Sequence, residues 1–135
     1  MNTPIANAGD KAIVLVMDDD PHIRSILEKM LTRFGYQVET TRDGSEALTR
    51  YQALMNAGRV PGAVILDLTV PGGMGGSEAS ERLLALDPEA RIIVSSGDLG
   101  SPMASDLQEK GLKGALAKPF QLATLKETIQ SILEK

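Results

Sequence analysis

The chain has 135 residues, the size of one ordinary domain, and 42% of them are hydrophobic, so we expect a single core. It has no cysteine, which excludes disulfides, thiolate metal sites and a cysteine nucleophile and fits a reducing compartment. The net charge of −4 gives no basic field for nucleic acid, and no run approaches the ~20 apolar residues of a membrane span. We therefore predict a soluble, cytoplasmic protein that neither binds nucleic acid directly nor inserts into a membrane.

The chain divides into a short arm and one domain. Residues 1–11 are small and polar without periodicity, so we predict a flexible N-terminal arm, followed by a domain over residues 12–135. Within that domain, short aliphatic runs alternate with longer helical patterns. The predicted strands are residues 12–17, 36–40, 63–68, 91–95 and 114–117.

The segments between these strands carry apolar residues at helical spacing. The spacing is clear over residues 23–34, 47–55 and 122–133 and weaker over residues 77–86 and 101–110. Local signals agree: Asp43 with Glu46 forms a capping-box pattern, Ser101-Pro102 is typical of a helix start, and Gly35 and Gly111 are typical of helix ends.

Strand and helix alternate five times, which predicts a parallel sheet with right-handed crossovers and helices on both faces. This is the doubly wound α/β class, in which ligands bind just outside the carboxyl ends of the strands. We therefore look for chemistry at those ends.

Four strand ends carry polar residues: Asp18-Asp19-Asp20, Asp67, Ser95-Ser96-Gly97 and Lys118-Pro119-Phe120. Asp20 is better explained as a helix N-cap, because Pro21 follows it. Placing Asp18 and Asp19 with Asp67 brings like charges to ~5 Å, which costs roughly 3 kcal/mol per pair at an effective dielectric constant of about 20. Carboxylates without histidine or cysteine favour Mg²⁺ or Mn²⁺. The alternative is an acidic loop exposed to solvent.

Four motifs occur in order on these strand ends: VLVMDDDPHIR, VILDLTVPG, IVSSG and LAKPF. Together they resemble the motifs of response-regulator receiver domains over about residues 12–134. The resemblance implies a flavodoxin-like (βα)5 fold with a five-stranded parallel sheet of order 2-1-3-4-5. The GGMGG segment after Pro71, which we expect to form a flexible turn, is similar to that of receivers attached to hybrid sensor histidine kinases.

The resemblance implies a role for each site residue. Asp67 would accept the phosphoryl group, while Asp18, Asp19, Asp67 and the backbone carbonyl of Thr69 would hold Mg²⁺. Lys118 would pair with Asp67 before transfer and with a phosphoryl oxygen after it, and the peptide bond that follows it is cis in the family. The chemistry agrees, because a carboxylate attacks an anionic phosphoryl group only when positive charge offsets their repulsion.

Two further groups are expected: a hydroxyl that binds the phosphoryl group and a histidine that donates it. By the resemblance, Ser96 with Gly97 after it would hydrogen-bond the phosphoryl group; if the strand ended one residue earlier, Ser95 would take this role. His22, the only histidine, lies on the first turn of a helix and is expected to face solvent. The donor histidine would therefore belong to a partner, a sensor histidine kinase or a histidine phosphotransfer domain.

The output of the signal is less well defined. Many receivers have tyrosine or phenylalanine shortly before the lysine, where this chain has Ala115. The aromatic rearrangement that transmits the signal in many receivers is therefore in doubt, although phosphorylation does not depend on it. The resemblance further implies that the first helix docks the histidine-bearing bundle.

Three other functions fit the sequence less well. A haloacid-dehalogenase-like phosphatase would need a second acid where Thr69 stands, and a dinucleotide-binding domain would need its glycines after the first strand. A receiver-shaped module that docks a partner without phosphorylation is disfavoured by the complete set of site residues.

Overall fold

The computed structural model describes residues 12–97 and 111–133. They contain one five-stranded parallel sheet in the order β2-β1-β3-β4-β5, which confirms the predicted fold class and strand order. Each observed strand lies within one residue of its prediction at either end. The strands are β1 (Ile13–Met17), β2 (Gln37–Thr41), β3 (Ala63–Asp67), β4 (Ile92–Ser96) and β5 (Gly114–Ala117).

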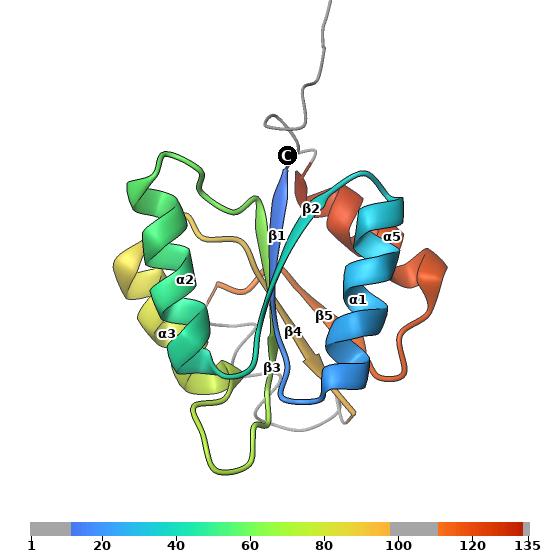
Figure 1. Ribbon diagram of the computed structural model, residues 1–135, viewed down its shortest axis with the longest axis horizontal. Helices are drawn as coiled ribbons and strands as arrows, with labels where there is room; N and C mark the ends of the chain where they lie inside the picture. Colours follow the sequence, from blue (N-terminus) through green and yellow to red (C-terminus); the bar gives the residue numbers. More distant parts are fainter. Residues whose placement is uncertain (1–11, 98–110, 134–135) are drawn as a thin grey trace, which may run out of the picture.

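Helices cover both faces of this sheet. Figure 1 shows α1 and α5 on one side of the strands and α2 and α3 on the other. The helices are α1 (Pro21–Arg33), α2 (Gly44–Asn56), α3 (Gly76–Leu86) and α5 (Leu122–Leu133). The predicted arm, the predicted helix over residues 101–110 and its Ser101-Pro102 start lie outside the described residues. Within the described part of the chain, no helix has the length and apolar character of a membrane span.

Side chains alternate between the two faces along each strand. The strand residues that pack against α1 and α5 are Val14, Val16, Ala63, Ile65, Ile93 and Leu116. Those that pack on the side of α2 and α3 are Leu15, Met17, Val64, Leu66 and Ile92. This alternation decides which side chains at the carboxyl ends of the strands share a face.

The predicted helix caps are present, with one difference. Asp20 caps α1 by accepting a hydrogen bond from the backbone N–H of His22, and Pro21 begins the helix. Asp43 caps α2 through the N–H of Glu46. The Glu46 carboxylate, however, accepts from the N–H of Arg42 and not from that of Asp43, because the Arg42 guanidinium also binds it.

The predicted helix end at Gly35 is confirmed, whereas the helix that Gly111 would end lies outside the described residues. Gly35 follows α1 with a φ of 96° and Gly111 has a φ of 100°, conformations that glycine adopts without strain.

The glycine-rich segment after β3 begins with a turn at Gly72, as predicted, but its last two glycines belong to the start of a helix and are packed tightly. Gly75 is the N-cap of α3 and Gly76 its first residue. A Cβ atom at Gly76 would lie 2.6 Å from the carbonyl oxygen of Asp67, and one at Gly75 would lie 2.6 Å from that of Leu68. The absence of side chains thus lets α3 begin directly against the end of β3.

Candidate functional site

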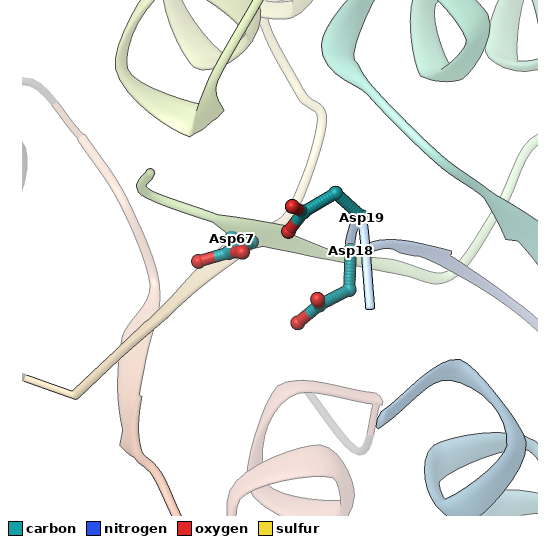
Figure 2. Close-up of side chains that lie close together, drawn as sticks. All are labelled: Asp18, Asp19 and Asp67. Atoms are coloured by element: carbon teal, nitrogen blue, oxygen red, sulfur yellow. The ribbon is translucent and has the colours of Figure 1, made fainter. Parts of the chain in front are cut away.

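Three carboxylates meet at the carboxyl edge of the sheet. Asp18 and Asp19 follow β1 directly, and Asp67 is the last residue of β3. One oxygen from each lies within 4.8 Å of the others. Figure 2 shows the three side chains close together. Asp18 and Asp67 are buried, with 1% and 4% of their surface exposed, whereas Asp19 faces solvent. The structure therefore brings together the three acids that the sequence places at strand ends.

The ammonium group of Lys118 enters this cluster from β5. Its Nζ lies 2.8 Å from Asp18 Oδ2 and 3.3 Å from Asp67 Oδ2. The backbone N–H of Lys118 donates to the carbonyl of Ser96 at 3.0 Å, which extends the pairing of β4 with β5 beyond the strand ends. The Lys118–Pro119 peptide bond is cis, as the resemblance implies. The close pairing with Asp18 was not predicted.

Burial and neighbouring charges raise the pKa values of both Asp67 and Lys118, for different reasons. Burial, reinforced by the negative charge of Asp18, raises the pKa of Asp67, although Lys118 and the N–H of Thr69 favour its ionised form. Burial alone would lower the pKa of Lys118, but Asp18 and Asp67 outweigh it, so the pKa is raised. The ammonium is therefore firmly charged, while the cluster of acids still carries excess negative charge.

The residues present fit a hard divalent cation. Asp18 is held in place because its Oδ1 accepts from the N–H of Asp20 at 2.9 Å and its carbonyl accepts from Arg24 Nη1 at 2.8 Å. Its buried Oδ2 receives no well-aligned hydrogen bond, although the Lys118 ammonium is close. A buried carboxylate oxygen beside two further carboxylates is the type of ligand that Mg²⁺ prefers.

The backbone of Thr69 lies beside Asp67, since its N–H donates to Asp67 Oδ1 at 3.3 Å. Ser96 is the last residue of β4 and is partly exposed. The metal role of the Thr69 carbonyl and the phosphoryl role of Ser96 stay predictions.

Sequence reasoning considered Ser95 only as a substitute for Ser96, but the structure places it directly beside Asp67. It pairs in register with Asp67, and its buried Oγ has no hydrogen-bond partner. Because Ile93 packs toward α1 and α5, alternation places Ser95 on that same face. The available signal was the alternation of side chains along a strand, which places residue 95 on the same face as residue 93.

Two further positions differ from the cluster residues: His22 lies away from the cluster, and Ala115 lacks the aromatic ring of many receivers. His22 is exposed on the first turn of α1, as predicted. Ala115 pairs in register with Val94 and packs with Leu112 against Leu68 and Val94. At this position of β5, aliphatic side chains stand where many receivers have an aromatic ring.

Residues 14–130 match the family described as the response regulator receiver domain. The chain belongs to this receiver family. As a receiver, it takes part in two-component phosphorelay signalling, in which receiver domains interact with kinases and phosphotransfer proteins.

Curated relatives include whole proteins and parts of larger ones. The receiver is 33% identical to the chemotaxis protein CheY of Thermotoga maritima over 121 residues, which cover 88% of this chain and 95% of that protein. It is 31% identical to the C4-dicarboxylate transport transcriptional regulatory protein DctD of Rhizobium meliloti, covering 90% of this chain but 25% of that protein. The likeness to receivers of hybrid kinases stays a prediction.

Solved structures agree with the fold. The response regulator protein TrrA from Thermotoga maritima, in complex with Mg²⁺ and BeF, superposes with a TM-score of 0.78 at 30% identity, covering 90% of this chain and 99% of that one.

Proposed function

We propose that Asp67 of this receiver accepts a phosphoryl group from a phosphohistidine on a sensor histidine kinase or histidine phosphotransfer domain. The observation that carries this proposal is the grouping of a buried Asp67 with Asp18, Asp19 and the Lys118 ammonium at one sheet edge. A nucleophile, a cation site and a fixed positive charge are thus available within one small volume.

The transfer is a direct displacement at phosphorus. An oxygen of Asp67 forms the new bond, the bond from phosphorus to the histidine nitrogen breaks, and that nitrogen keeps the electron pair. Lys118 moves its ammonium from Asp67 to a phosphoryl oxygen, and the hydroxyl of Ser96 donates to another. When bound by Asp18, Asp19, Asp67 and the Thr69 carbonyl, Mg²⁺ or Mn²⁺ would supply the positive charge that offsets the repulsion between anions.

The partner would dock where the chain leaves the carboxyl edge of the sheet. Ile26 on α1 and Leu122 at the start of α5 are exposed to 43% and 47%, although both are large apolar residues. The helices that carry them begin shortly after Asp18 and Lys118 in the chain. These exposed apolar side chains would contact the histidine-bearing helices of the partner.

The receiver would also assist its own phosphorylation, because its own side chains supply the charged groups. We expect acetyl phosphate with Mg²⁺ to add one phosphoryl group, seen by intact mass and removed by hydroxylamine. Chelation of Mg²⁺ and the Asp67→Asn substitution should each abolish it, while Asp20→Asn, at the helix cap, should not.

Two results would contradict the proposal. An adduct that persists in Asp67→Asn would sink the assignment of the acceptor. If the wild-type chain bound Mg²⁺ but formed no adduct with any phosphodonor, a receiver-shaped docking module would be the better description.

A further inference from the structure

The hydroxyl of Ser95 lies under the candidate site without a partner. Ser95 is 1% exposed, and its Oγ makes no hydrogen bond among the described residues. In the sheet it pairs with Asp67 on one side and with Leu116 on the other. Neighbouring strands lie about 4.8 Å apart, so Ser95 is next to the proposed phosphoacceptor.

Ser95 also shares a sheet face with the charged residues of the site. Ile65, Ile93 and Leu116 pack toward α1 and α5, and the residues two places further on are Asp67, Ser95 and Lys118. Side chains two residues apart on a strand point to the same face.

The side chain of Lys118 extends across β4 at the level of Ser95. The lysine follows β5, yet its ammonium reaches Asp67 on β3 and Asp18 after β1. Strand β4 lies between β5 and β3, so the lysine side chain extends across β4. On the shared face, the residue of β4 at this level is Ser95, since it is the register partner of Asp67. A small side chain here leaves room for the lysine.

We propose that Ser95 is a positioning residue for Lys118: its small size opens the path across β4, and its hydroxyl accepts a hydrogen bond from the Lys118 ammonium when a divalent cation engages Asp18. The inference rests on the proposed function of the site. An ammonium has three N–H donors, and losing Asp18 as a partner frees one of them. The unpaired Oγ of Ser95 is a buried acceptor beside its path.

This role depends on the state of the site, which separates it from a structural one. Among the described residues the Ser95 hydroxyl has no hydrogen-bond partner, so Ser95→Ala should leave the melting temperature without Mg²⁺ unchanged or slightly raised. Ser80 is also 1% exposed, but its hydroxyl donates to the carbonyl of Ser77. Ser80→Ala is therefore the control for loss of a buried hydroxyl that already has a partner.

The first measurement follows the Lys118 ammonium by NMR during titration with Mg²⁺ alone. In the wild-type chain we expect its N–H signal to stay protected from solvent exchange, and in Ser95→Ala we expect that protection to fall. The second measures the rate of phosphorylation by acetyl phosphate with Mg²⁺. Ser95→Ala should lower this rate roughly tenfold, the effect of one hydrogen bond to a charged group. Ser95→Val, which also fills the path, should lower it further, whereas Ser80→Ala should not change it.

Equal Lys118 protection in the wild type and Ser95→Ala would overturn the inference, as would phosphorylation of both proteins at the same measurable rate. The NMR measurement needs only Mg²⁺, so it decides the role of Ser95 even if the wild-type chain takes up no phosphoryl group. A wild-type chain that takes up no phosphoryl group would contradict the proposed function alone.

Discussion

The ammonium nitrogen of Lys118 lies 2.8 Å from the Oδ2 of Asp18, closer than the 3.3 Å that separates it from the carboxylate of Asp67. The lysine is therefore paired with a proposed metal ligand as well as with the proposed phosphoacceptor. An ammonium and a divalent cation would compete for the same buried oxygen.

This competition predicts opposite effects of one substitution. Lys118→Met should tighten Mg²⁺ binding about fivefold, equivalent to about 1 kcal/mol, because it frees Asp18 and removes a positive charge. The same variant should be phosphorylated much more slowly. Calorimetric titration with Mg²⁺ checks the affinity, with Lys113→Met, at an exposed position before β5, as the control. Weaker Mg²⁺ binding in Lys118→Met would show that the lysine does not compete.

The raised pKa of Asp67 predicts a pH-dependent stability. A carboxyl group whose pKa is higher in the folded chain contributes stability below its unfolded pKa of about 4, and this is lost as pH rises through the folded pKa. At neutral pH, without divalent cations, Asp67→Asn should therefore raise the free energy of unfolding. Urea unfolding at neutral pH and at about pH 3.5 tests this, because the gain should vanish at the lower pH. A less stable Asn variant at neutral pH would contradict the electrostatic account.

The close approach of α3 to β3 predicts that Gly76 tolerates no side chain. Gly76→Ala should lower the free energy of unfolding by about 1–3 kcal/mol, because a Cβ would lie 2.6 Å from the Asp67 carbonyl oxygen. Gly97→Ala is the control, since its Cβ would meet nothing within 4 Å. Chemical denaturation measures both. Equal stability of the two variants would mean that α3 can move away from the site without cost.

The buried tyrosine of α2 predicts a loss of stability in alkali. Tyr51 donates to Asp87 Oδ2 at 2.6 Å, and burial together with this bond raises the pKa of Tyr51. Stability linked to this group is present below the unfolded pKa of about 10 and is lost as pH rises above it. Tyr51→Phe should cost about 1.5 kcal/mol at neutral pH and reduce the alkaline loss. Unfolding measurements at neutral pH and above about pH 10 check this. In an Asp87→Asn background, the cost of Tyr51→Phe at neutral pH should shrink.

The sequence was sufficient for the fold and for the three carboxylates, because strand ends in a parallel sheet converge on one edge. It was not sufficient for long-range side-chain contacts. The pairing of Lys118 with Asp18 depends on how far a flexible side chain extends across two strands, which no local pattern encodes. The Glu46 bond to Arg42 likewise depends on a competing guanidinium. Gly75 and Gly76 looked like a turn, since close backbone packing is invisible before the chain is folded.

The central claim is that Asp67 itself carries the phosphoryl group. After phosphorylation by acetyl phosphate with Mg²⁺, borohydride reduction converts an aspartyl phosphate to homoserine, and peptide mass spectrometry locates the converted residue. We predict homoserine at position 67 and at no other acidic position, with none formed when Mg²⁺ is chelated. Homoserine at position 18 or 19 instead, or an unmodified Asp67 in a phosphorylated chain, would contradict the account.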